Sequence, residues 1–163
     1  MTYFEDLSSY VYEPSYGTSQ TKNVGWLERG HEFAQMSPSE RDLELLWSYC
    51  QLSIVQTRGV HECDLCEPHQ IVVVERQGFK LLLGTSEIRV FSNDGIVYAA
   101  PSLIYHYVNF HHYKPPEEFL KALREGPPPP SQEYFEKLNE IDRNWCRKES
   151  YVDGKAFTLS PPP

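Results

Sequence analysis

The sequence predicts an α+β fold, with a small β-rich centre surrounded by about four helices. Three observations support this class. A capping signal near residue 38 precedes apolar residues at helical spacing, strand-length apolar runs with turn signals fill the middle of the chain, and further helical patterns follow. The 163 residues are enough to bury one hydrophobic core.

The first helix is expected over residues 38–51. Ser37, Pro38 and Glu40 match a capping box, in which serine is the N-cap, proline takes the first helical position and glutamate the third. Apolar residues then follow on one face: Leu43, Leu46, Trp47 and Cys50. Upstream of this helix, residues 10–12 and 24–27 are predicted as short strands.

The middle of the chain is predicted to be β structure. The expected strands cover residues 52–60, 71–74, 80–83, 87–91 and 96–98. Gln77 and Gly78 indicate a turn between the second and third of these strands. Asn93, Asp94 and Gly95 are a strong signal for a hairpin between the last two.

Three more helices are expected downstream. Pro101 fits the first position of the second helix, which ends before Pro115, and the third helix runs from Pro116 to Gly126. After a four-proline spacer, Ser131 can cap a fourth helix over residues 131–147. The apolar stripe of this helix, which we expect to pack on the same core, comprises Tyr134, Phe135, Leu138, Ile141 and Trp145.

Cys63 and Cys66 give the clearest chemical signal in the chain. Two thiolates separated by two residues can bind one zinc ion from a tight knuckle and leave two tetrahedral positions open. His106 and His111 have a spacing familiar from zinc sites, so we predict a structural zinc ion bound by Cys63, Cys66, His106 and His111. Five residues of ideal helix turn through about 140°, so the helix must unwind before His111 for both imidazoles to reach one ion.

Other assignments of these residues remain open. His61 can replace one of the two helical histidines, and His69 and His112 are further candidates. The histidines can instead be hydrogen-bonded core residues with no metal, and a Cys-x-x-Cys pair can be a redox centre, although the context of a thioredoxin-like unit is missing. Cys50 and Cys146 have no partner at ligand spacing and are expected to be buried as small hydrophobic residues.

A knuckle, β structure and a helix with the last ligands form a treble-clef-like arrangement. The expected organisation is one zinc-stabilised α+β domain over residues 1–126. The proline spacer, the C-terminal helix and the tail, residues 127–163, are expected to pack on that same domain.

The overall charge limits the function classes. Fifteen basic and 23 acidic residues give a formal charge of -8, which disfavours nucleic acid as a partner and suits a basic protein partner. The N-terminus has no secretory signal and no apolar stretch is long enough to span a membrane, so we predict a cytoplasmic protein without a membrane partner. Thiols stay reduced in the cytoplasm, which favours a metal over a disulfide.

Several short motifs recur together in one order. They are NVGWL with GH after it at residues 23–31, GVHECDLC at 59–66, GTSEI at 84–88, YAAPSLI at 98–104, and HYV continuing to PPEEF at 106–119. With these motifs the chain resembles an uncharacterised bacterial domain family over roughly residues 3–125. The resemblance implies a bacterial origin and a Cys/His site, and it brings no mechanism with it.

Three functions are considered. The first is a non-enzymatic, immunity- or antitoxin-like protein that binds a basic partner, which the size, the acidic charge and the abundant tyrosine and tryptophan favour. The second is a zinc-dependent hydrolase or nuclease at the Cys/His cluster, with His61 or His31 as the general base and Glu62 as a nearby carboxylate. The third is a zinc-ribbon-like nucleic-acid binder, which the charge disfavours. A closed shell of four protein ligands favours the first function over the second.

Overall fold

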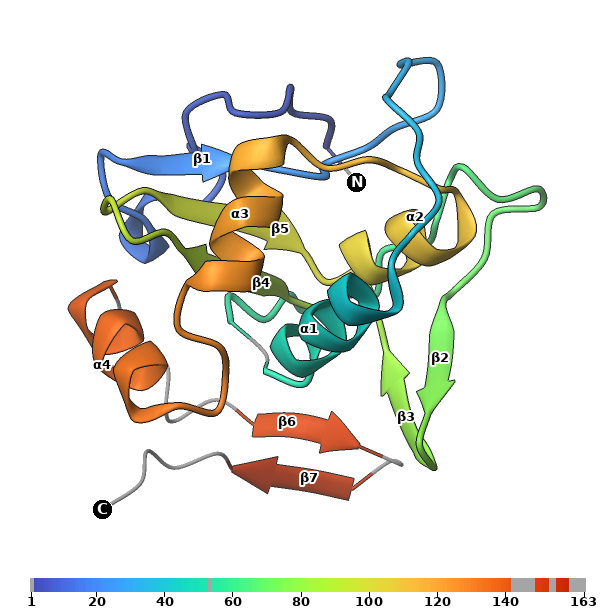
Figure 1. The fold of residues 1–163 in the computed structure, drawn as a ribbon. Coiled ribbons are helices and arrows are strands. Elements are labelled where there is room, and N and C mark those ends of the chain that lie inside the picture. The colour runs from blue at the N-terminus through green and yellow to red at the C-terminus, as the bar shows by residue number, and fades with distance from the viewer. Residues whose placement is uncertain (1, 53, 142–148, 153–154, 159–163) are drawn as a thin grey trace.

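A three-stranded mixed sheet forms the centre of the molecule in the computed structural model, which describes residues 2–52, 54–141, 149–152 and 155–158 (Figure 1). Its strand order is β1 (Thr21–Asn23), β5 (Val97–Pro101) and β4 (Glu87–Phe91), with β1 parallel to β5 and β4 antiparallel to β5. The predicted Asn93-Asp94-Gly95 turn joins β4 to β5, and Gly95 takes the positive φ that such a turn needs. Together with four helices this sheet confirms the α+β class.

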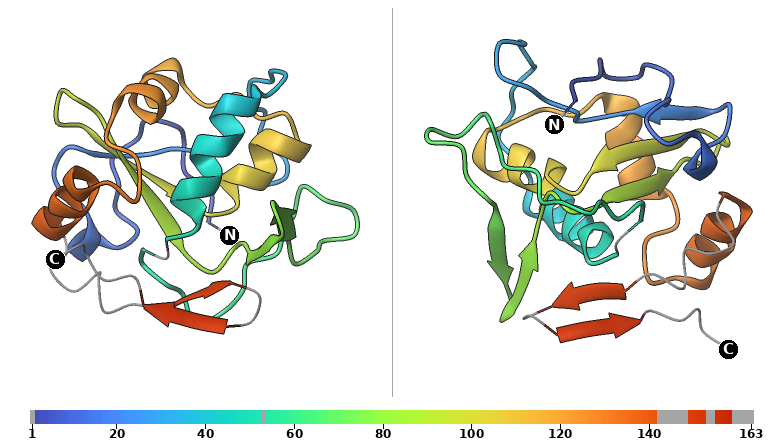
Figure 2. Two further views of the ribbon diagram at one scale, coloured as in Figure 1. Left: turned by 60° about the horizontal axis from the view of Figure 1, so that its bottom comes forward. Right: turned by 180° about the vertical axis from the view of Figure 1, so that it is seen from behind.

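Helices cover one face of this sheet. Figure 1 shows α3 (Glu117–Glu125) lying across the strands, and Figure 2 shows α1 (Glu40–Cys50) side by side with α2 (Ile104–Phe110). The sheet side chains that face these helices alternate along β4, where Ile88 and Val90 are both fully buried. This one core extends from the sheet to the segment that contains Cys63 and Cys66.

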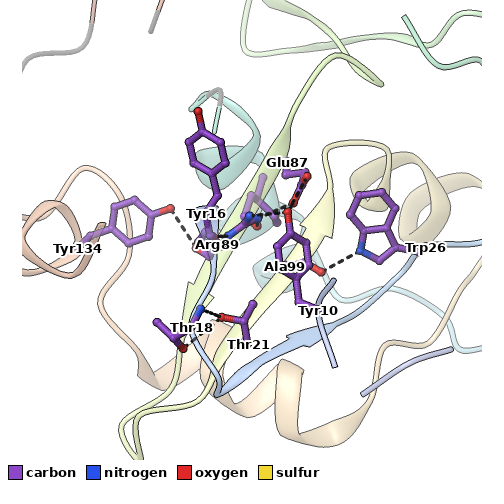
Figure 3. Close-up of polar contacts among 10 residues, drawn as sticks. Tyr10, Tyr16, Thr18, Thr21, Trp26, Glu87, Arg89, Ala99 and Tyr134 are labelled. Carbon is purple, nitrogen blue, oxygen red and sulfur yellow. Dashed lines mark hydrogen bonds and ion pairs between the residues drawn. The ribbon is translucent and has the colours of Figure 1, made fainter. Parts of the chain in front are cut away.

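The N-terminal segment covers the opposite face of the sheet (Figure 3). The buried Arg89 guanidinium donates to the Glu87 carboxylate at 2.7 Å and to the Tyr10 hydroxyl at 3.1 Å. Tyr10 in turn donates to Glu87, and the Trp26 indole N–H donates to the Ala99 carbonyl at 3.1 Å. Because the buried charges are paired and hydrogen-bonded, this polar layer can lie inside the molecule without an uncompensated ion.

A separate hairpin projects from the body beside α2 (Figure 2, right). It consists of β2 (Val73–Arg76) and β3 (Phe79–Leu82), and its predicted turn has Gln77 and Gly78 both at positive φ. The described residues also include a 3-10 turn η1 (Pro14–Tyr16) and a C-terminal hairpin of β6 (Glu149–Val152) and β7 (Lys155–Thr158).

The cap of α1 differs from the prediction. The helix begins at Glu40, and Ser39 rather than Ser37 is the N-cap, because the Ser39 hydroxyl accepts from the backbone N–H of Asp42 at 3.1 Å. Asp42 is buried in this first turn and pairs with Arg124 of α3. The ion pair between Asp42 and Arg124 thus favours Ser39 as the N-cap, because this start of the helix places Asp42 against α3.

Positive φ angles explain two strand predictions that were wrong. Residues 24–27 are not a strand because Gly25, at φ 71°, turns the chain just after β1. In the described part of residues 52–60 the pairing is an isolated bridge between Ile54 and Glu87, and Val55, at φ 51°, interrupts it before Thr57 donates to the carbonyl of Thr85. Residues 10–12 also form no strand, since the pairing in that region is a single bridge between Ser9 and Lys22.

The start of the second helix was also misplaced. Pro101 is the last residue of β5, where it lies opposite Glu87, and α2 begins only at Ile104. By contrast, α3 is capped by Pro116 and Gly126 as expected.

The last described helix is α4 (Gln132–Ile141), whose Tyr134 amide donates to the Ser131 hydroxyl as a cap. Tyr134, Phe135 and Leu138 are buried in the common core and Ile141 is partly buried against it, whereas Trp145 lies outside the described residues. No helix in the described ranges combines the length and apolar character needed to cross a membrane.

Candidate metal centre

Cys63 and Cys66 lie on a tight turn at the edge of the core. The backbone N–H of Cys63 donates to the carbonyl of Gln70 at 2.9 Å, which closes the turn, and both cysteine side chains are buried. The chain before the turn is fixed by the His61 N–H, which donates to the carbonyl of Gly84 at 2.8 Å. Both thiol groups therefore point inward from a knuckle that is anchored on either side.

His106 and His111 approach from the two ends of α2. His106 lies in its first turn and is buried, while the helix ends at Phe110 and His111 is the C-cap. His112 then takes φ 57°, and the Tyr113 N–H folds back to the carbonyl of Tyr107 at 3.0 Å. This early end of the helix brings the two imidazole rings to a centroid distance of 4.9 Å, as the expected unwinding requires.

The four predicted candidates come together at one point. The Nε2 atom of His111 lies 3.4 Å from the sulfur of Cys63 and 3.4 Å from that of Cys66, and the Nε2 atom of His106 lies 3.4 Å from Cys66. All four potential ligand atoms lie within 4.8 Å of one another. Tetrahedral zinc with ordinary bond lengths separates sulfur from nitrogen by roughly 3.6 Å, so the donor set fits such an ion.

Burial controls the protonation of these groups. It raises the pKa of the Cys63 thiol to about 11 and lowers the pKa of His106 to about 4. The imidazole is therefore neutral at pH 7, which is the form that binds a metal. The thiol must lose its proton, and a bound cation drives that loss. The cluster can thus release protons in exchange for a metal ion.

A buried tyrosine hydroxyl lies beside the cysteines. Tyr107 is fully buried, and its hydroxyl has no hydrogen-bond partner among the described residues. Burial raises the pKa of its phenol, and the nearby charges of Cys63, Asp64 and Cys66 raise it further. A metal-bound thiolate would give this O–H an acceptor, which is the kind of outer interaction that orients metal ligands.

Arg29 holds the outside of the knuckle. Its guanidinium donates to the carbonyl of Asp64 at 2.8 Å, to the carbonyl of Cys66 at 3.0 Å and to the carboxylate of Glu67. Arg29 lies between the NVGWL and GH motifs of the sequence, and nothing local there indicates a contact with residues more than 30 positions away.

Phe110 covers the histidines from the solvent side. Its ring is 61 % exposed, yet it stacks on His106 at a centroid distance of 5.2 Å and an interplanar angle of 11°. It also meets His111 edge to face at 5.1 Å. An apolar ring in this position restricts the access of water to the cluster.

The structure places the other candidate histidines elsewhere. His61 lines a small crevice with Tyr12, Trp26 and Glu87, and it is not among the four residues whose ligand atoms converge. His31 stacks on Tyr3 at 3.7 Å. The treble-clef likeness is not established, because the β4–β5 hairpin lies between the first hairpin and the helix that contains the histidines.

Comparisons with known proteins identify the family. No curated protein and no solved structure matches the chain. A family model described as a domain of unknown function (DUF7919) matches residues 2–124, which include the knuckle, both hairpins of the central region and the helices α1, α2 and most of α3. The predicted resemblance to an uncharacterised domain family is thereby confirmed, and the chain belongs to the DUF7919 family.

Proposed function

We propose that this chain is a non-enzymatic protein-binding domain whose fold is held together by one structural zinc ion. The observation that supports this proposal is the convergence of two thiols and two imidazoles at Cys63, Cys66, His106 and His111. Soft sulfur and imidazole nitrogen in tetrahedral arrangement are the donors that zinc prefers. These donors come from two segments separated by about 40 residues, so one ion would join the knuckle to α2.

A structural role follows from the number of ligands. Catalytic zinc sites keep a position open for water, whereas four protein ligands complete the tetrahedral shell. Three of the four groups are buried, and Phe110 stacks over the His106 imidazole. Substrate access to such an ion would require a ligand to leave.

The composition and surface support the binding role. The chain has a formal charge of -8, which would steer association with a basic protein. Large apolar side chains are exposed on the projecting hairpin and next to the cluster: Ile71, Val73, Phe79, Leu82 and Phe110. We propose an immunity- or antitoxin-like protein of the bacterial cytoplasm, where reduced thiols remain available for the metal.

The first test compares two histidine variants. We expect purified wild-type protein to contain about one zinc ion per chain by elemental analysis. His106→Ala should lose this zinc and should lower the free energy of unfolding by on the order of 3 kcal/mol, because metal binding is coupled to folding. His61→Ala, the matched control, should keep its zinc, and urea titrations should give it close to the wild-type free energy of unfolding.

Two results would overturn the proposal in different ways. Protein with no stoichiometric transition metal, prepared without chelators, would remove the metal centre. A folded and zinc-loaded His61→Ala variant that loses a measurable hydrolytic activity of the wild type would favour the zinc-dependent hydrolase or nuclease instead.

A further inference from the structure

A second site lies at the far edge of the central sheet, in a cleft between the β4–β5 turn and α3. The cleft has a volume of about 360 Å³, and its wall on the turn side includes Ser92 and Asp94. Its other wall is the exposed face of α3, with Glu118, Lys121 and Glu125.

The rim of this cleft is acidic. Three carboxylates, Asp94, Glu118 and Glu125, stand against one ammonium group, Lys121, which leaves two negative charges around the opening. The Ser92 hydroxyl donates to Asp94 and lowers the pKa of that carboxyl, so Asp94 is charged at neutral pH. The rim therefore attracts a cationic group.

The floor of the cleft offers an unused polar atom. Tyr98 is only 3 % exposed, and no described residue is hydrogen-bonded to its hydroxyl. Tyr98, Asp94 and Glu118 line the same cleft. Burial raises the pKa of the Tyr98 phenol, and the charges of Asp94 and Glu118 raise it further. The Tyr98 side chain is thus almost wholly buried, while its hydroxyl is not among the buried polar atoms without a partner. A hydroxyl that lines an opening and has no protein partner is typical of a position that a ligand completes.

Contacts within the protein hold both walls in place. The Ile96 N–H donates to the Ser92 hydroxyl at 2.9 Å, which fixes the turn that presents Asp94. The end of α3 touches β4 so closely that a Cβ on Gly126 would lie 2.0 Å from the carbonyl oxygen of Phe91. Preorganised walls reduce the entropy that binding costs.

We propose that this cleft binds an arginine side chain of the protein partner, an inference that rests on the proposed binding function. A guanidinium group has five N–H donors in one plane, so it can reach Asp94 and Glu118 on opposite walls and the Tyr98 oxygen between them. An ammonium group is a compact point charge that cannot span the walls in this way.

Two other hollows among the described residues do not share this chemistry. One, of about 240 Å³, has Arg58 on its wall and no carboxylate. The crevice beside His61 has room for about one water molecule, and its carboxylate Glu87 is already paired with Arg89. Charge complementarity with a basic partner therefore selects the cleft at α3.

The test uses a small probe and the full zinc-loaded chain. We expect acetyl-arginine methylamide, titrated into 15N-labelled protein, to shift the backbone amides of residues 92–96 and of α3, with half-saturation in the millimolar range. The neutral isostere acetyl-citrulline methylamide should leave these amides unshifted, and acetyl-lysine methylamide should bind more weakly than the arginine probe.

Three variants define the site. Asp94→Asn together with Glu118→Gln should raise the half-saturation concentration roughly fivefold, because two surface charge pairs are lost. Lys121→Gln should lower it, since it removes the one repulsive charge. Glu32→Gln, an exposed glutamate outside the cleft, should leave it unchanged.

Shifts spread over the whole surface, equal shifts with citrulline, or the same half-saturation in the Asp94/Glu118 variant would overturn the arginine site. These outcomes are separate from failure of the proposed function, because the probe reports on the cleft without any partner. If the probe binds here but the zinc ion proves catalytic, only the proposed function is wrong.

Discussion

Gly84 connects the two halves of the metal centre. Its carbonyl accepts the hydrogen bond from His61, at the entry to the knuckle, and its N–H donates to the Ser102 hydroxyl at 2.9 Å, just before α2. It has φ 81°, and a Cβ at this position would lie 2.2 Å from the carbonyl oxygen of His61. Only glycine allows the backbone of the knuckle to approach so closely.

We expect Gly84→Ala to lower the free energy of unfolding by about 3 kcal/mol, from the left-handed backbone and the steric clash together. Gly95→Ala is a matched control, because Gly95 also has a positive φ (89°) but no atom within 4 Å of the added Cβ. It should cost only about 1 kcal/mol. Urea unfolding measures both values, and equal losses would show that the contact with His61 is unimportant.

At the scale of elements, an ion pair joins α1 to α3 beside their shared apolar core. The Arg124 guanidinium donates to both carboxylate oxygens of Asp42, at 2.8 and 2.7 Å. Asp42 is buried, whereas the Arg124 side chain is 38 % exposed. The bidentate pair lowers the pKa of Asp42 from its usual 3.8, mainly through the hydrogen bonds from Arg124.

We expect Arg124→Gln to destabilise the protein by about 2 kcal/mol, since it leaves a buried carboxylate unpaired but at a partly solvated site. Asp42→Asn with Arg124→Gln should recover most of this loss. Because the folded-state pKa of Asp42 is lowered, the coupling is fully present above pH 3.8 and is lost as the pH falls through the folded-state value. Double-mutant cycles from urea titrations at several pH values test this; a coupling that persists in acid contradicts it.

Local signals predicted the elements that depend on local physics. The hairpin turns at Gln77-Gly78 and Asn93-Asp94-Gly95 and the proline at the start of α3 need no distant partner, and all were predicted. Gly126 was also predicted as the end of α3, although its close contact with Phe91 is a tertiary one. Two strand predictions failed at backbone turns with a positive φ, and the N-cap prediction failed where a tertiary contact decides the outcome. Ser39 replaced Ser37 as the N-cap because Asp42 pairs with Arg124, and no local pattern shows that pair.

The metal centre shows the same division. Spacing alone identified the four residues that converge, because a knuckle and a helix end present ligands in a local way. The residues that support them were missed: Arg29, Gly84, Tyr107 and Phe110. Some of them contact a segment that is distant in the sequence, and others act through where an aromatic ring lies. The identity of a single residue reveals neither of these.

For the whole molecule, α4 closes one end of the core. The Tyr134 hydroxyl donates to the carbonyl of Arg89 at 3.0 Å, and its ring contacts Tyr49 and Phe91, both at a centroid distance of 5.4 Å. Residues 132–141 lie beyond the stretch that the family model matches, yet they bury side chains in the same core.

We expect a chain that ends at residue 126 to lose on the order of 4 kcal/mol of stability and to aggregate. Its core side chains would be exposed where Tyr134, Phe135 and Leu138 cover them in the full chain. A chain that ends at residue 141 keeps α4 and is the control, which we expect to stay monomeric by size-exclusion chromatography with light scattering. If the shorter chain is equally stable and monomeric, α4 serves a partner and not this core.

The wide separation of the two ligand pairs has a consequence for the amount of protein in a cell. On the proposed function, the complete site exists only in the folded chain, so zinc stabilises that chain by mass action. At a free zinc concentration 100 times the dissociation constant this contributes about 2.7 kcal/mol, and the contribution falls as zinc becomes scarce. The folded, protease-resistant fraction would then rise and fall with the zinc supply. Starvation for the metal would lower the amount of folded domain without any change in its synthesis.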